Sequence, residues 1–443
     1  MFFERPASGD VAILVHMNVE SAGEDSDPRE FEELALSAGA SPAAFIIGNL
    51  KKVSARLFVG SGKLEEIRQA VLLHQAEIVL FDHTLTPSQE RNLEKELSCR
   101  VLDRTGLILD IFAQRARSHE GKLQVELAQL RHSVTRLVRG WTHLDRQKGG
   151  IGLRGAGETQ LEIDQRLIGV RIKAINKGLA KVRSQRNQGR RARKRAEIPT
   201  ISLVGYTNAG KSSLFNRLSH SDIYVANQLF ATLDSTLRKI QIPDYGTAIV
   251  ADTVGFIRKL PHQLVDAFHA TLEETVEASL LLHVIDCHDE NRDMFKEQVD
   301  TVLKEIGAID IPTLLVYNKV DLLDSHPTGM ERDDQGKPLR VWVSAATGAG
   351  LGDLLQAISE LLGNDVIEPQ LQILPQQGRL RARLYRQGAV QAESVDDEGK
   401  VELSLRLPRD EFIRLLRAEG IDPLPLLPAL ISSCDSTAPP LPI

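Results

Sequence analysis

The chain has 443 residues, enough for about three domains of ordinary size. Its hydrophobic content of 42% supports sizeable buried cores, and it has no run of about 18 apolar residues that would cross a membrane. The three cysteines, Cys99, Cys287 and Cys434, are too few and too far apart for a disulfide framework or a zinc site. The first residues lack the pattern of a secretory signal, so we expect a cytoplasmic protein.

The net charge of −6 does not by itself indicate a nucleic acid partner, but the basic residues are unevenly spread. Residues 181–195 carry eight basic groups and no acidic one, and residues 115–154 carry nine against three. Such tracts can be solvated helix faces, yet two of them in an acidic chain favour contact with a phosphate backbone. The predicted RNA-binding residues are Arg146, Lys148, Arg154, Arg190, Arg191, Arg193, Lys194 and Arg195.

Residues 1–115 are predicted to form a small α/β domain, because strand-like apolar runs alternate with helical patterns along them. The expected elements are strands at 11–15, 43–47, 77–81 and 100–102 and helices at 29–38, 62–75 and 87–97.

Residues 116–198 are predicted to form a helical hairpin that ends in a basic linker. Apolar residues recur in alternating steps of four and three from Leu123 to Leu137 and from Ile168 to Val182, the spacing of packed helices. The connector at 140–157 contains six glycines, so we interpret it as a flexible basic tip on a stiff stalk. A loop with no target is the alternative.

Residues 205–212 match the phosphate-binding loop pattern G-x4-G-K-[ST]. A strand-like run at 200–204 precedes the loop and a helical pattern at 212–218 follows it, which is the context that the motif requires. Backbone N–H groups of such a loop bind phosphate oxygens. We expect Lys211 to reach the β- and γ-phosphates and the Ser212 hydroxyl to bind Mg²⁺.

Two further motifs lie where switch residues are expected. Asp252 ends an apolar strand and is predicted to hold Mg²⁺ through water, and Gly255 leaves its N–H free to meet the γ-phosphate. Thr232 lies between the loop and Asp252, where a threonine completes the Mg²⁺ ligands. We therefore predict Lys211, Thr232 and Gly255 as catalytic residues.

Residues 318–321 read Asn-Lys-Val-Asp and indicate recognition of guanine. The Asp321 carboxylate can accept hydrogen bonds from N1–H and the 2-amino group of guanine, and adenine offers neither. Together, the ordered motifs predict a GTPase domain at 199–363 with a doubly wound, mostly parallel sheet. The predicted nucleotide-binding residues are Gly205, Tyr206, Thr207, Asn208, Ala209, Gly210, Lys211, Ser212, Phe230, Ala231, Thr232, Leu233, Asp234, Asp252, Thr253, Val254, Gly255, Asn318, Lys319, Val320, Asp321, Ser344, Ala345 and Ala346.

Two positions in these motifs bear on the rate of hydrolysis. Phe256 stands where many signalling GTPases have a water-positioning glutamine, so we expect slow turnover, on the order of 10⁻⁴ to 10⁻² per second, until a partner assists. Asn208 is similar to the asparagine of potassium-activated GTPases, which suggests K⁺ as a second cofactor beside Mg²⁺. A purely conformational role of Asn208 is the alternative.

Residues 364–422 are predicted to form a small α+β domain, with strands at 380–385, 389–393 and 401–407 and a helix at 409–418. Residues 423–443 contain six prolines and are expected to be extended or disordered.

Five segments of the chain carry a resemblance to a known family: residues 103–116, 120–128, 148–162, 230–234 and 252–256. They resemble the HflX family of ribosome-associated GTPases, and the tip departs from that family at Ala156. It implies a monomeric factor that binds GTP or GDP and, in its GTP state, the large (50S) ribosomal subunit and its 23S rRNA. It also implies splitting of stalled or idle 70S ribosomes under stress. The N-terminal region of the family is linked to ATP use, but residues 1–115 contain no Walker-type loop.

Two other function classes compete with this interpretation. A GTP-dependent switch could regulate an RNA-processing or membrane-associated protein, because a basic helix also suits an anionic membrane. An RNA-modifying GTPase would need a catalytic cysteine or a cofactor site outside the GTPase domain, and the sequence shows neither.

Overall fold

A computed structural model of the chain groups it into two compact units. The first comprises residues 1–240, 248–328 and 342–349, and the second comprises 241–247, 329–341 and 350–443. The structure describes residues 10–19, 28–140, 160–195, 198–220, 229–243, 245–258, 269–323, 329–363, 366–367, 369–373, 378–386, 388–395, 401–408, 412 and 415–416.

The first unit begins with a four-stranded parallel sheet in the order β2-β1-β3-β4. Its core is apolar, since Ile13, Leu14 and Val15 of the central strand are fully buried. All four predicted strands and all three predicted helices are present. The elements are β1 (Val11–Val19), α1 (Pro28–Ser37), β2 (Ser41–Leu50), α2 (Ser61–His74), β3 (Ile78–Phe81), α3 (Pro87–Leu97) and β4 (Arg100–Asp103).

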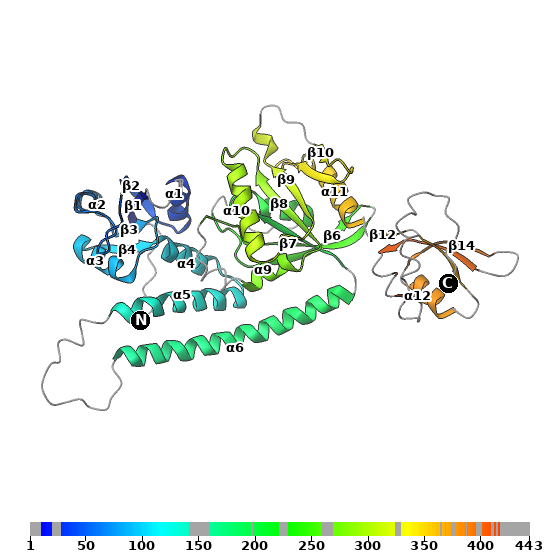
Figure 1. Ribbon diagram of the computed structural model, residues 1–443, viewed down its shortest axis with the longest axis horizontal. Helices are drawn as coiled ribbons and strands as arrows, with labels where there is room; N and C mark the ends of the chain where they lie inside the picture. The colour runs from blue at the N-terminus through cyan, green and yellow to red at the C-terminus, as the bar shows by residue number, and fades with distance from the viewer. Residues whose placement is uncertain are drawn as a thin grey trace. The chain divides into compact units, whose positions relative to one another are not determined.

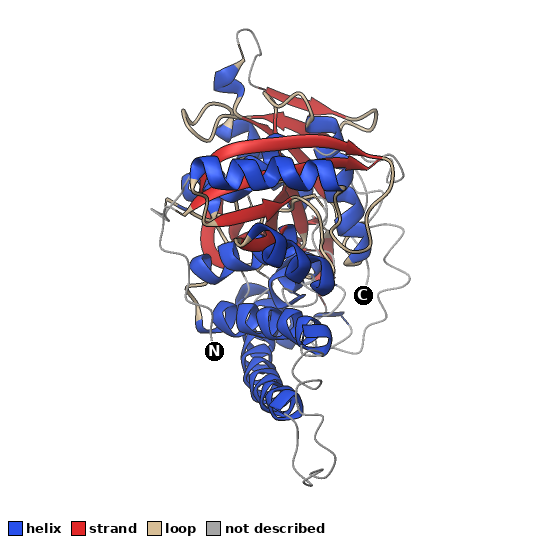
Figure 2. Cartoon of the chain, turned by 90° about the vertical axis from the view of Figure 1, so that its left-hand side faces the viewer, coloured by secondary structure: helices blue, strands red, loops and turns tan. Residues whose placement is uncertain are grey.

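Three helices follow this sheet: α4 (Arg104–Arg115), α5 (His119–Gly140) and α6 (Gln160–Arg195). The predicted hairpin is confirmed in its helical parts, because α5 and α6 pack side by side in Figure 1 and, turned by 90°, in Figure 2. Arg171 of α6 donates to Glu126 of α5 at 2.6 and 2.9 Å. The predicted tip, with Arg146, Lys148 and Arg154, lies outside the described residues.

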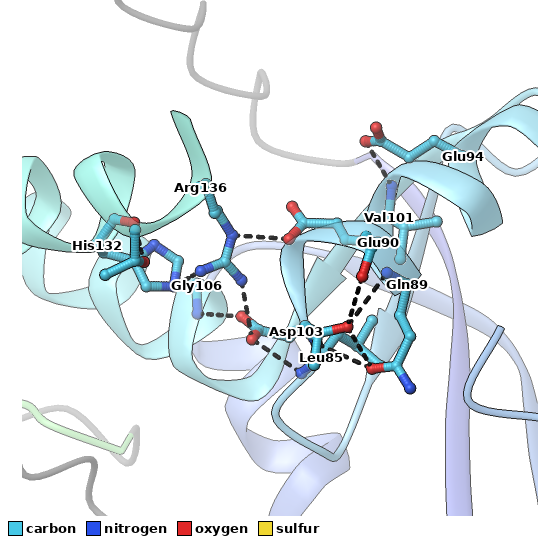
Figure 3. A network of polar contacts seen from close by, with 12 residues as sticks. Leu85, Gln89, Glu90, Glu94, Val101, Asp103, Gly106, His132 and Arg136 are labelled. Carbon is cyan, nitrogen blue, oxygen red and sulfur yellow. Dashed lines mark hydrogen bonds and ion pairs between the residues drawn. The ribbon is translucent and has the colours of Figure 1, made fainter. Parts of the chain in front are cut away.

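A polar network centred on a buried carboxylate fastens α5 to the N-terminal sheet (Figure 3). Arg136 of α5 donates to Glu90 of α3 at 2.7 Å and to Asp103 at 3.0 Å. Asp103 is fully buried and also accepts from the backbone N–H groups of Gly106, at the start of α4, and Leu85. Because one carboxylate serves three segments, α5 is fixed to the sheet by more than apolar packing.

The motifs predicted to bind GTP lie on a second sheet, whose strands in this unit follow the order β9-β8-β5-β7-β6. The pairs β9–β8, β8–β5 and β5–β7 are parallel, so the predicted mostly parallel, doubly wound sheet is confirmed. The elements are β5 (Thr200–Gly205), α7 (Lys211–Ser219), β6 (Thr236–Ile242), β7 (Gly246–Asp252), α9 (His269–Val276), β8 (Leu280–Asp286), α10 (Arg292–Glu305), β9 (Thr313–Asn318) and the 3-10 helix η2 (Val320–Leu322).

The second unit contains a small α+β module with the antiparallel sheet β13-β15-β14. The predicted strand at 380–385 is wrong, because the segment is helical. Leu380 and Leu384 are both buried, and a spacing of four places them on one helix face. The elements of the second unit are β10 (Gly329–Arg332), β11 (Pro338–Trp342), α11 (Leu351–Gly363), β12 (Val366–Ile367), β13 (Gln370–Ile373), α12 (Gly378–Arg386), β14 (Val390–Val395), β15 (Val401–Leu405) and β16 (Leu407–Pro408).

Among the helices that the structure describes, none combines the length and the apolar character that crossing a membrane requires.

Candidate nucleotide site

The phosphate-binding loop connects the buried strand β5 to α7, and two glycines make its path possible. Gly205 and Gly210 have φ of 146° and 92°, a region that favours glycine. A Cβ at Gly205 would lie 2.3 Å from the carbonyl oxygen of Val284, and one at Gly210 would lie 2.1 Å from Nδ2 of Asn318. The glycines therefore allow the loop to pack closely against β8 and β9.

Lys211 is the charged centre of the loop and is only 6% exposed. Its Nζ donates to the carbonyl oxygens of Gly205 at 3.0 Å and Tyr206 at 2.6 Å. Burial lowers the pKa of Lys211 to about 8, and the Asp252 carboxylate opposes the shift. The ammonium is therefore still mostly protonated at pH 7, as binding of phosphate requires.

Three oxygen donors from three separate segments meet beside Lys211. Oδ2 of Asp252 accepts from the hydroxyls of Ser212 at 2.8 Å and Thr232 at 2.9 Å, and these two hydroxyl oxygens lie 2.7 Å apart. Burial raises the pKa of Asp252, although both hydroxyls and Lys211 oppose the shift. Oδ1 of Asp252 is buried and has no hydrogen-bond partner among the described atoms. A carboxylate with two hydroxyls is a hard oxygen set of the kind that Mg²⁺ prefers.

Gly255 lies where the segment after β7 touches the phosphate-binding loop. A Cβ at this position would lie 2.8 Å from Cγ2 of Thr207 and 3.0 Å from Nζ of Lys211. The absence of a side chain therefore keeps space open beside the lysine ammonium.

We expect Gly255→Ala to reduce single-turnover GTP hydrolysis by about 100-fold, because the added methyl group displaces the loop or Lys211 from the reacting geometry. The control is Gly352→Ala, since a Cβ at Gly352 would meet nothing within 4 Å. Hydrolysis by Gly255→Ala at the control's rate would contradict this assignment.

Phe256 joins the segment after β7 to the phosphate-binding loop through its backbone. Its N–H donates to Gly205 at 3.2 Å, and its carbonyl oxygen accepts from Thr207 N–H at 2.8 Å. The side chain is 3% exposed and lies in the apolar core. This burial agrees with the expectation that Phe256 cannot orient water.

The residues predicted to read guanine meet at the end of β9. The Asn318 amide connects two loops, because Oδ1 accepts from Ala345 N–H and Nδ2 donates to the Ala209 carbonyl, both at 2.9 Å. Asp321 is exposed, and its Oδ1 accepts from the Ser344 hydroxyl at 2.5 Å. Asn318 thus joins the segment of Ala345 to the phosphate-binding loop. The Asp321 carboxylate, the predicted acceptor for guanine, follows directly after it.

Several predicted nucleotide-binding residues have buried side chains. Phe230, Leu233, Val254 and Val320 are buried in apolar cores, and the Thr253 hydroxyl donates to the Leu203 carbonyl at 2.5 Å. Their side chains belong to the core, so a contact of these residues with the nucleotide would come from the backbone. They stay predicted nucleotide-binding residues.

The Asp234 carboxylate accepts from the backbone N–H groups of Arg117 and Ser118, directly before α5. Nζ of Lys319 lies 2.6 Å from Oδ2 of Asp286, so this ion pair holds the lysine side chain beside the end of β8.

One predicted RNA contact is corrected by the structure. Arg190 of α6 pairs with Glu273 at 2.7 Å and Glu274 at 3.4 Å in α9, and its side chain is only 15% exposed. Its charge serves the contact between α6 and the GTPase domain because acidic side chains of α9 lie opposite it. Arg191, Arg193, Lys194 and Arg195 belong to α6, but their side chains lie outside the described part of the structure.

The sequence did not reveal a buried polar chain that leads from the N-terminal sheet to the phosphate-binding loop. Arg104 pairs with Glu30 and, at 2.6 Å, with Asp82, which in turn bonds to His16 at 2.8 Å. The Tyr206 hydroxyl donates to Glu30. Burial and the Glu30 charge raise the pKa of Tyr206, so its hydroxyl stays protonated.

The same chain reaches the segment after β7. Arg258 N–H donates to the Tyr206 hydroxyl at 3.0 Å, and the Arg258 carbonyl accepts from Arg104 at 3.1 Å. Burial acts to raise the pKa of Asp82, but the hydrogen bond from His16 and the charge of Arg104 outweigh it and lower this pKa. No sequence signal links these residues, because the partners are far apart along the chain.

We expect Arg104→Ala to lower the free energy of unfolding by about 3–5 kcal/mol, since it leaves two buried carboxylates without their shared cation. Urea unfolding measures the loss. The matched control is Arg56→Ala, which removes an exposed ion pair and costs about 1 kcal/mol or less. An equal cost for the two variants would contradict the importance of the buried chain.

A cavity of about 380 Å³ adjoins the phosphate-binding loop between α1 and α10. The described residues that line it include Asn208 and Ala209 but neither Lys211 nor Asp321. The nucleotide site is therefore located by its hydrogen-bonding residues and not by this cavity.

Four family models match the chain. They are described as GTP-binding GTPase N-terminal at residues 25–113, GTP-binding GTPase Middle Region at 115–193, 50S ribosome-binding GTPase at 200–319 and HflX C-terminal domain at 330–425.

Two relatives agree with these models, and one solved structure is similar to the chain. GTPase HflX of Escherichia coli (strain K12) is 55% identical over 417 residues, which cover 94% of this chain and 98% of that protein. GTPase HflX of Caldanaerobacter subterraneus subsp. tengcongensis is 45% identical over 388 residues, 88% of this chain and 89% of that protein. A GTP-binding protein from Sulfolobus solfataricus, solved in complex with GDP, is similar with a TM-score of 0.42 and 24% identity, covering 79% of this chain and 98% of that one.

Proposed function

Because the chain belongs to the HflX family of GTPases, we propose that it uses GTP to control binding to the large (50S) ribosomal subunit. The observation that carries the proposal is the meeting of Lys211, Ser212, Thr232 and Asp252 at the carboxyl ends of adjacent parallel strands. The description of the GTPase-domain model as ribosome-binding supports the choice of partner.

The residues beside Lys211 fit a magnesium ion. Ser212 and Thr232 would hold Mg²⁺ through their hydroxyls, and Asp252 would hold it through water. When bound, this ion neutralises charge on the β- and γ-phosphates. Lys211 and the loop N–H groups orient the phosphates, and Gly255 leaves space for the γ-phosphate.

Hydrolysis without a partner is proposed to be slow. Phe256 is apolar and buried, so no side chain at this position can orient the attacking water. A partner that orders the segments of Thr232 and Gly255 would raise the rate. We propose that the large ribosomal subunit is this partner and that its 23S rRNA contacts the basic tip and the end of α6.

The output that we propose is the splitting of stalled or idle 70S ribosomes under stress. GTP orders the switch segments and permits docking, and hydrolysis releases the protein from the subunit. The test is GTP turnover with and without purified 50S subunits, beside a sucrose gradient of 70S particles incubated with the protein and GMPPNP. Strong stimulation and conversion of 70S into subunits support the proposal.

Unchanged turnover and intact 70S particles would overturn the proposal and favour a GTP switch for another partner. Binding to anionic liposomes and not to ribosomes would direct that search toward membranes.

We further propose K⁺ as a cofactor near Asn208. Its side chain is exposed, and its φ of 62° lies in the left-handed region. Asparagine tolerates this conformation, so a purely conformational role is the alternative to a potassium site. Faster turnover in KCl than in NaCl at equal ionic strength is the expected result, and equal turnover would remove the potassium site.

A further inference from the structure

The carboxylate of Asp234 caps the start of α5. It bonds to Ser118, which precedes Asp234 by 116 residues in the sequence. Oδ2 accepts from the backbone N–H groups of Arg117 at 2.9 Å and Ser118 at 2.7 Å, and Oδ1 accepts from the Ser118 hydroxyl at 2.5 Å. A Cβ at Gly121 would lie 2.1 Å from Oδ1. The carboxylate is thus fitted against the first turn of α5, where an anion is also favoured by the helix dipole.

A second anchor holds the other end of the same segment. Leu229 N–H donates to the Ser37 hydroxyl of α1 at 3.0 Å. The ring of Phe230 packs edge-on against Phe112 of α4, with centroids 4.6 Å apart, and is 2% exposed. Residues 229–234 therefore span from α1 and α4 to α5, and Thr232 lies between the two anchors.

The contacted helix does not move alone. Arg136 fixes α5 to Asp103 and Glu90 of the N-terminal domain (Figure 3). Arg171 fixes α6 to α5 through Glu126. A displacement of the first turn of α5 is therefore transmitted to a packed assembly of sheet and hairpin, because packed elements shift as units.

We propose that Asp234 is a positioning residue that fixes Thr232 to the first turn of α5 and so couples the nucleotide state to the helical hairpin. The inference rests on the proposed role of Thr232 at the magnesium ion. Thr232 and Asp234 are two residues apart, so we infer that the segment strengthens its contact with Arg117 and Ser118 when it closes on Mg²⁺·GTP. By linkage, loss of the contact then weakens triphosphate binding by the factor by which GTP strengthens the contact.

Asp234→Asn is the test variant, because an amide keeps the size of the carboxylate but places a donor where the structure has acceptors. We expect about a tenfold loss of affinity for GMPPNP with Mg²⁺ and less than a twofold change for GDP. The charge-matched control is Asp310→Asn, an exposed position in the loop before β9, and it should leave both affinities unchanged.

Hydrogen exchange of the full chain, measured without nucleotide, with GDP and with GMPPNP, separates positioning from simple structural support. In the wild type, amides of residues 117–122 are expected to be better protected with GMPPNP than with GDP. In Asp234→Asn this difference is lost, while the nucleotide-dependent protection of residues 207–212 remains. Ser118→Ala should reduce the difference in the same direction.

The outcomes distinguish the two claims. If the amides of 207–212 respond to nucleotide and those of 117–122 do not, the coupling is overturned and the GTPase site stands. If Asp234→Asn weakens GDP and GMPPNP equally, its role is structural only and the inference also fails. If residues 207–212 do not respond in the wild type, the proposed nucleotide site fails and the inference fails with it.

Discussion

Asp321→Asn is expected to shift the base preference of the protein from guanine to xanthine by about 10⁴-fold in the ratio of affinities. The wild-type carboxylate offers acceptors for N1–H and the 2-amino group of guanine. An asparagine offers one acceptor and one donor, which suits N1–H and the 2-carbonyl group of xanthine. The Ser344 hydroxyl donates to Oδ1 of Asp321 and so fixes the orientation of the carboxylate that would face the base.

Competition of GTP and XTP against a fluorescent GDP analogue measures this change. The charge-matched control Asp310→Asn should keep the wild-type preference for GTP. A variant at Asp321 that loses stability but still prefers GTP would show that the carboxylate supports the loop around Ser344 and does not read the base.

Lys211→Ala is the second change with a large expected effect. Its ammonium is buried and bonded to the loop carbonyls of Gly205 and Tyr206, so in the reaction it is placed to face phosphate oxygens. We expect a loss of about 10²- to 10³-fold in the rate of GTP hydrolysis, the usual effect of removing one preorganised donor. Single-turnover kinetics at saturating GTP measure the rate of the hydrolysis step independently of any loss of GTP affinity.

The control for this variant is Lys304→Ala, which removes an exposed charge in the last turn of α10. Unfolding by urea checks that Lys211→Ala stays folded under the assay conditions, since the change leaves the loop carbonyls of Gly205 and Tyr206 without their donor. Hydrolysis within a few-fold of the wild type would contradict the assignment of Lys211.

The part of the site that follows motif spacing was predictable from the sequence. Asp252 ends β7, Lys211 and Ser212 follow the end of β5, and Asp321 follows the end of β9. Parallel pairing brings these strand ends together. Thr232 was placed only by its position in the chain, and its hydroxyl does meet Ser212 and Asp252.

The contacts that surround the site were not predictable in the same way. Glu30 with Tyr206, and Ser118 with Asp234, join residues more than a hundred positions apart, and a single sequence holds no periodic signal for such pairs. Short apolar segments mislead for another reason. Residues 380–384 fit both an alternating strand and a helix with a spacing of four, and packing of the module decides for the helix.

The central claim is that the GTP-bound protein binds the large ribosomal subunit, and co-sedimentation with purified 50S subunits tests it most directly. The full chain is spun through a sucrose cushion with 50S subunits in GMPPNP, in GDP, and without nucleotide, and bound protein is counted per subunit. We predict near-stoichiometric binding with GMPPNP and little with GDP. Equal binding in all three conditions, or none in any, would contradict a GTP-controlled ribosomal function.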